Sequence, residues 1–122
     1  MDSNWIDETA QLYTERNFGG EVGIGERPAL LVIDLINAFT DPDTDLGSDV
    51  ESVLVQTERL LDAFREYDLP RYFTTIAYED SYGDAGQFIE KVPALRDLEL
   101  GTAAVEVDNR VAPVDEERVI LK

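Results

Sequence analysis

The feature that most constrains this chain is an apolar run at residues 29–34, Ala-Leu-Leu-Val-Ile-Asp, that ends in a carboxylate. Such a run is typical of a strand that is buried on both faces of a parallel sheet. A segment with a 3.6-residue apolar period follows and extends to about Tyr67, and the β-branched and aromatic residues 71–77 come next. Strand, helix and strand in this order predict an α/β fold around a parallel sheet.

The region before this unit has a different character. Residues 3–16 show a helical period, and Ser3 or Asn4 is in place to cap the helix. A glycine cluster then precedes the first strand, whereas a dinucleotide-binding fingerprint needs its glycines after a strand, so we reject that interpretation. We therefore expect an N-terminal helical extension at residues 1–18 and one domain at residues 19–122.

The remaining segments are shorter. Residues 40–49 form an acidic loop, and Ser48 with Glu51 predicts a capping box for the helix that follows. Residues 88–98 predict one or two short helices. Residues 119–121 predict a third strand, which ends at Lys122.

Charge limits the partners. The 122 residues contain 27 Asp and Glu against 10 Lys and Arg, a net charge of −17, which would repel nucleic acid and anionic membranes. A dense acidic surface with only two lysines favours a salt-loving host, where salt screens self-repulsion. The first residues lack the pattern of a signal peptide, and no apolar run is long enough to span a bilayer, so we expect a cytoplasmic protein.

Cysteine and histidine are both absent from the sequence. Their absence removes thiol nucleophiles, Ser-His-Asp triads and zinc sites built on imidazole or thiolate. The chemistry of these residues therefore rests on carboxylates, lysines, hydroxyls and backbone.

Two charged residues end predicted strands. Asp34 ends the first strand, and ligands of open α/β sheets bind at the carboxyl ends of strands. A partly desolvated carboxylate there can act as a general base, but it can equally cap the following turn. Lys122 ends the third strand and would face the same crevice, although position alone favours a solvated lysine.

Several ordered segments resemble the isochorismatase-like cysteine hydrolases, in particular the N-carbamoylsarcosine amidase-type branch. The resemblance covers about residues 18–122. The segments are FGGEVGIGE (18–26), RPALLVIDLINAFT (27–40), PRYFTTIAY (70–78), DAG (84–86), KVPALRDLELGT (91–102) and ERVILK (117–122). The resemblance implies the N-terminal half of a three-layer α/β/α, Rossmann-like fold whose full parallel sheet has the strand order 3-2-1-4-5-6.

The resemblance also implies roles for individual residues. Asp34 matches the catalytic acid–base aspartate and Lys122 the catalytic lysine, while Asn37, Phe39 and Tyr78 are candidates for the substrate pocket. In the family, the nucleophilic cysteine and the oxyanion hole follow the lysine, so we expect this chain to stop before them and to be inactive alone. The implied reaction is hydrolysis of the C–N bond of an N-carbamoyl amino acid or a small amide.

No cofactor or metal is expected. Metal-dependent nicotinamidases of the same family use histidines after the second strand, where this chain has Thr-Thr-Ile-Ala-Tyr at residues 74–78.

Two alternative functions rest on other features of the sequence. The acidic loop places Asp41, Asp43 and Asp45 at the 1-3-5 spacing of a calcium loop, but Leu46 and Ser52 stand where glycine and glutamate are required. The second alternative is a non-catalytic interaction module. Without a fourth strand, the first strand would have an unpaired edge, so we expect a homo-oligomer or a separate C-terminal half as partner.

Overall fold

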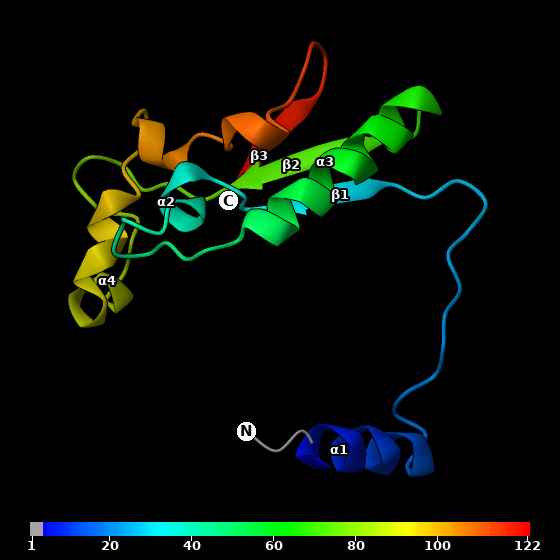
Figure 1. Ribbon diagram of the computed structural model, residues 1–122. Coiled ribbons are helices and arrows are strands. Elements are labelled where there is room, and N and C mark those ends of the chain that lie inside the picture. Colours follow the sequence, from blue (N-terminus) through cyan, green and yellow to red (C-terminus); the bar gives the residue numbers. More distant parts are fainter. Residues whose placement is uncertain (1–3) are drawn as a thin grey trace.

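The computed structural model describes residues 4–122 and contains a three-stranded parallel sheet (Figure 1). Its strands are β1 (Leu30–Ile33), β2 (Arg71–Thr75) and β3 (Arg118–Leu121), in the spatial order β1-β2-β3. Val32 lies opposite Phe73, and Phe73 lies opposite Val119. The sheet confirms the predicted α/β class, and its parallel register brings the carboxyl ends of all three strands to one edge.

One face of the sheet carries the main core. The crossover helix α3 (Glu51–Glu66) packs across β1 and β2, because its apolar residues recur at the helical period. The side chains of Leu54, Leu61 and Phe73 are almost completely buried here, together with Val32 and Val111. Burial of each large side chain stabilises the fold by roughly 2–3 kcal/mol.

A second core lies beyond the carboxyl ends of the strands. It consists of Ile36, Ala38, Ala77, Leu98 and Val105. Short helices bring these residues together; they are α2 (Asn37–Thr40), α4 (Phe88–Lys91), η1 (Pro93–Asp97), η2 (Ala103–Val105) and η3 (Asn109–Val111). This cluster anchors the segments that follow β1 and β2, so it sets the shape of the edge where the strands end.

The opposite face of the sheet is open. Leu31 and Ile33 of β1 are 51% and 57% exposed, and Tyr72 and Ile120 are exposed beside them. The expectation that the first strand is buried on both faces is therefore wrong for these residues, because α3 covers one face only. Within residues 4–122, β1 pairs with β2 alone, which leaves its other edge without a strand.

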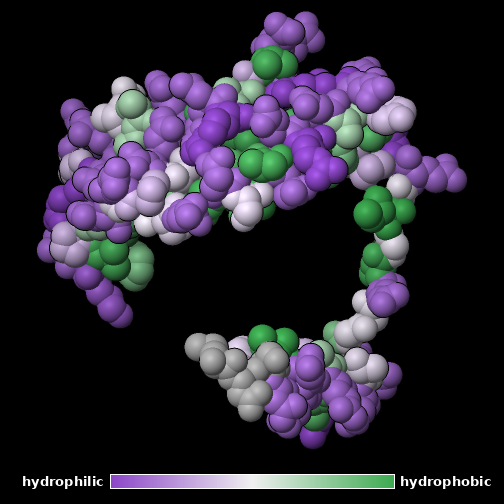
Figure 2. Space-filling model, viewed as in Figure 1, coloured by the Kyte–Doolittle hydropathy of each residue, from purple (hydrophilic) through white to green (hydrophobic). Residues whose placement is uncertain are grey.

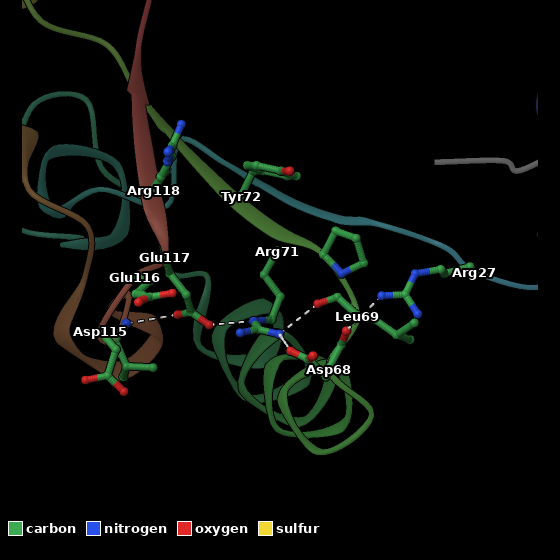
Figure 3. A pocket seen from close by; sticks show the side chains of 11 residues that line it. Arg27, Asp68, Leu69, Arg71, Tyr72, Asp115, Glu116, Glu117 and Arg118 are labelled. Atoms are coloured by element: carbon green, nitrogen blue, oxygen red, sulfur yellow. Dashed lines mark hydrogen bonds and ion pairs between the residues drawn. The ribbon is translucent and has the colours of Figure 1, made fainter.

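A buried carboxylate holds the start of β3. Glu117 accepts hydrogen bonds from Arg65 at 2.7 Å and from Arg71 at 2.6 Å, and its side chain is only 3% exposed. The Arg65 guanidinium is the main reason that the pKa of Glu117 falls to about 2, with the backbone N–H of Val114 and Arg71 assisting. Figure 3 shows Arg71 between Glu117 and the turn before β2.

A second polar contact joins the region after β1 to the region before β3. The hydroxyl of Thr40 donates to Asp108 at 2.7 Å, and Arg110 donates to both oxygens of the same carboxylate. The hydrogen bonds from Arg110 hold the pKa of Asp108 well below its usual range, with Thr40 acting in the same direction.

The helix α1 (Asn4–Glu15) stands apart from the sheet in Figure 1 and buries none of its residues. Ser3, one predicted cap, lies outside the described residues. An extended glycine-containing segment joins α1 to β1, and apolar residues along it are visible in Figure 2. Val22 and Ile24 there are 95% and 88% exposed. Across residues 4–122, the structure contains no helix that is both long and apolar enough to cross a membrane.

Several element boundaries differ from the predictions. The first strand ends at Ile33 rather than Asp34, and the second ends at Thr75 because the following residues join the second core. The predicted capping box is wrong: Val50 rather than Ser48 precedes the first turn of α3, its side chain makes no capping hydrogen bond, and Asp49 Oδ1 accepts the N–H of Glu51. The one or two short helices predicted for residues 88–98 are confirmed as two, because α4 ends at Lys91 and η1 begins at Pro93.

Candidate active site

Asp34 and Lys122 meet at the carboxyl edge of the sheet. The Nζ atom of Lys122 lies 2.7 Å from Oδ2 of Asp34, and the two side chains are 47% and 20% exposed. β2 lies between the strands that carry them, so Lys122 extends across its end. The backbone N–H of Lys122 donates to Thr75 O at 3.0 Å, which extends the β2–β3 ladder to the last residue. The solvated lysine favoured by position alone is therefore replaced by an ion pair, while the catalytic role of the pair stays a prediction.

The backbone turns sharply at Asp34. Its φ is 55°, in the left-handed region that few residues with a side chain adopt, although Asp is among those that tolerate it best. The Asp34 N–H donates to Thr74 O at 3.2 Å, so Asp34 lies at the point where the pairing of β1 with β2 ends.

A threonine that sequence analysis did not select also touches the carboxylate. The hydroxyl of Thr74 donates to Asp34 Oδ1 at 2.7 Å and lies 3.2 Å from the Asp34 nitrogen. Thr74 lies opposite Ile33 in the strand register, and only the pairing of β1 with β2 brings it to Asp34. The signal that would have found it is a hydroxyl at the carboxyl end of the neighbouring strand.

The three predicted pocket residues have other contacts. Asn37 Nδ2 donates to Ala103 O at 2.8 Å, and this contact fixes the loop beside α2. Phe39 and Tyr78 pack, partly buried, against the second core. The backbone N–H of Tyr78 donates to Leu98 O at 2.7 Å. These contacts place the three residues in the segments that follow β1 and β2, and their contact with a substrate stays a prediction.

A hollow of about 1040 Å³ lies at the opposite end of the sheet, near the starts of β2 and β3 (Figure 3). Its lining carries both signs of charge, so the charges largely cancel; the charged residues are Arg27, Arg71 and Arg118 against Asp68, Asp115, Glu116 and Glu117. Because it lies far from the Asp34 carboxylate along the strands, we do not assign it to the same chemistry.

The acidic loop forms a turn. Asp41 Oδ1 accepts the N–H of Asp43 at 2.9 Å, and Asp41 O accepts the hydroxyl of Thr44 at 2.9 Å. Among the residues that the structure describes, His, Cys, Asp and Glu form no group of three or more that could hold a metal ion.

Comparison with known proteins gives consistent matches. The pattern of the isochorismatase domain family matches residues 28–122. The chain is 32% identical over 117 residues to an N-carbamoylsarcosine amidase from Arthrobacter, a match that covers 91% of this chain and 44% of that protein. It is 30% identical over 107 residues to a maleamate amidohydrolase from Pseudomonas putida, covering 86% of this chain and 50% of that protein.

Solved structures share the fold. N-carbamoylsarcosine amidase from Thermoplasma acidophilum superposes with a TM-score of 0.62 at 20% identity, over 79% of this chain and 51% of that one. A cysteine hydrolase from Pseudomonas syringae pv. phaseolicola superposes with a TM-score of 0.70 at 23% identity, over 79% and 46% of the two chains. The chain thus spans about half the length of each of these relatives.

Proposed function

The chain belongs to the isochorismatase family of hydrolases, and we propose that it carries the acid–base part of an amidohydrolase site. In this proposal Asp34 is the general base and Lys122 is its charge partner. The observation that carries it is the 2.7 Å contact between Lys122 Nζ and Asp34 Oδ2, at the edge where α/β sheets bind ligands. The lysine ammonium holds the carboxylate by a charge-assisted hydrogen bond, and a carboxylate positioned in this way can act as a general base.

The proposed reaction breaks a C–N bond through a thioester. The Asp34 carboxylate takes the proton of a cysteine thiol, and the thiolate attacks the carbonyl carbon of the substrate. The tetrahedral intermediate collapses, and the leaving nitrogen takes a proton from Asp34 as the C–N bond breaks. Water then hydrolyses the thioester, with Asp34 again accepting a proton. The relative described as a cysteine hydrolase supports this assignment.

The thiol must come from outside these 122 residues, which contain no cysteine. We propose that a nucleophile-bearing segment packs along the free edge of β1 and over the open face of the sheet. The half-exposed Leu31 and Ile33 support this position, because apolar strand residues at an unpaired edge favour further pairing. A second copy of the chain is the alternative occupant. On this proposal, the 122 residues alone do not turn over substrate.

The proposed substrates are N-carbamoyl amino acids and small amides. Support comes from the two relatives that share at least 30% identity with this chain. One is described as an N-carbamoylsarcosine amidase and the other as a maleamate amidohydrolase. Both names describe hydrolysis of a C–N bond next to a carbonyl, and the same bond type fits a carboxylate base with a thiol nucleophile.

The proposal can be tested by complementation. The 122-residue chain is assayed for ammonia release from N-carbamoylsarcosine and maleamate, alone and after co-expression with the remaining half of the Arthrobacter relative. We expect no turnover alone and turnover in the complex that Asp34→Asn abolishes. Asp115→Asn is the matched control, because Asp115 also has a positive φ but is exposed and precedes β3. Turnover by the chain alone, or turnover that survives Asp34→Asn, would contradict the proposal. A complex of the two halves that forms but does not turn over substrate would favour the interaction module.

A further inference from the structure

Thr74 contacts Asp34 through both its hydroxyl and its backbone. The hydroxyl donates to Asp34 Oδ1 at 2.7 Å, and the N–H of Asp34 lies 3.2 Å from both the hydroxyl and the carbonyl oxygen of Thr74. We propose that Thr74 is a positioning residue that fixes the direction of the Asp34 carboxylate. The inference rests on the proposed function of Asp34 as a base. It adds Thr74 to the three groups already proposed for the site, which are Asp34, Lys122 and the cysteine thiol.

The two oxygens of the carboxylate are held from different strands. Oδ1 accepts from Thr74 on β2, and Oδ2 accepts from Lys122 at the end of β3. A carboxylate with one donor on each oxygen has a fixed plane, yet each oxygen keeps a lone pair for the proton of a nucleophile. A base that is fixed in this way does not need to reorient when the proton moves, which is the advantage of preorganisation.

The surroundings of both residues favour such a role. Asp34 has a φ of 55°, a conformation that costs energy for residues with a side chain and persists where neighbours hold it. Thr74 is 7% exposed, and its β-branched side chain has few rotamers, so its hydroxyl keeps one direction. Thr74 therefore contacts the strained residue through rigid backbone and a rigid side chain together.

The adjacent residue provides an internal comparison. Thr75 is 9% exposed, but it faces the other side of the sheet, and its hydroxyl donates to Val105 O at 2.6 Å. Loss of the Thr75 hydroxyl removes a buried hydrogen bond of similar length without touching the carboxylate. Thr75→Val thus reproduces the structural cost of Thr74→Val and leaves the orientation of Asp34 unchanged.

The test measures the orientation of Asp34 directly by NMR on the isotopically labelled 122-residue chain. Three-bond couplings from Cγ of Asp34 to its backbone N and C′ report the χ1 rotamer. We expect one rotamer in the wild type, averaging among rotamers in Thr74→Val, recovery in Thr74→Ser and one rotamer in Thr75→Val. The Asp34 N–H should also exchange with solvent up to about tenfold faster in Thr74→Val, because this variant lacks the hydroxyl oxygen that accepts the N–H.

A single Asp34 rotamer in folded Thr74→Val, or equal averaging in Thr75→Val, would overturn the inference. If Thr74→Val does not fold, the exchange of the Thr74 hydroxyl proton is compared between wild type and Asp34→Ala, and unchanged exchange would overturn it as well. These readouts need no turnover. A complemented enzyme that is insensitive to Asp34→Asn would thus refute the proposed function, whereas the NMR result decides the role of Thr74.

Discussion

The ammonium of Lys122 lies 2.7 Å from Oδ2 of Asp34, although 88 positions separate the two residues in the sequence. The contact crosses the end of β2 and links the first strand of the sheet to the last. Because Asp34 is only 20% exposed while Lys122 is 47% exposed, the carboxylate is the more fixed partner, and the lysine reaches toward it. The pair therefore depends on the pairing of all three strands.

Removal of the lysine charge should impair the complemented enzyme. Lys122→Met leaves Asp34 without its cation, so we expect kcat to fall by about 10²–10⁴-fold, the range typical for loss of acid–base assistance. The measurement is steady-state ammonia release by the chain co-expressed with the remaining half of a relative. Lys91→Met is the control, because Lys91 is the only other lysine and is exposed. Equal losses in both variants would argue against a specific role for Lys122.

Replacement of Glu117 should destabilise the fold in a pH-dependent way. At neutral pH, Glu117→Gln removes the charge that Arg65 and Arg71 bind, and we expect a loss of about 2 kcal/mol in the free energy of unfolding. The pKa of Glu117 is about 2 in the folded chain against an ordinary value of 4.5, so the ionised form contributes stability above pH 4.5. This contribution disappears as the pH falls toward 2.

Urea unfolding of both chains from pH 7 to pH 2 measures this effect. The difference between wild type and Glu117→Gln should be constant down to about pH 4.5 and should then narrow. Glu116→Gln is the matched control, because the neighbouring side chain is exposed. A difference that stays constant to pH 2 would show that the carboxylate charge is not what stabilises the start of β3.

Salt should stabilise the chain at neutral pH. The net charge of −17 produces self-repulsion, and the screening length falls from about 10 Å at 0.1 M salt to about 3 Å at 1 M. We expect the melting temperature to rise between 0.1 M and 2 M KCl. The same series near pH 4.1, the isoelectric point, serves as control and should show a smaller rise. A melting temperature that is independent of KCl at pH 7 would contradict the expectation of a salt-loving host.

Removal of residues 1–18 should leave the stability of the sheet almost unchanged. The helix α1 buries none of its residues, so its loss removes little apolar contact. We expect the melting temperature to change by no more than about 2 °C, which corresponds to well under 1 kcal/mol for a domain of this size. Phe73→Ala, which empties a fully buried site, should by contrast cost about 3–5 kcal/mol. A large loss on removal of residues 1–18 would refute the proposed domain boundary.

Local sequence pattern alone determined the elements that position the site. The apolar run before Asp34, the helical period of residues 51–66 and the β-branched segment from Arg71 specified a strand, a helix and a strand. These features follow from the periodicity of neighbouring residues and the right-handed crossover between parallel strands. The positions of Asp34 and Lys122 at the ends of strands followed in the same way.

Tertiary structure decided which side chains meet. The contact of the Thr74 hydroxyl with Asp34 and the burial of Glu117 between two arginines join residues that are 40 or more positions apart. Local periodicity holds no information on such distant pairs, and the register of β1 against β2 selects Thr74 rather than Thr75 as the partner of the carboxylate. A shift of one residue in that register would present the opposite face of the strand, which is why only the folded sheet determines the contacts of Asp34.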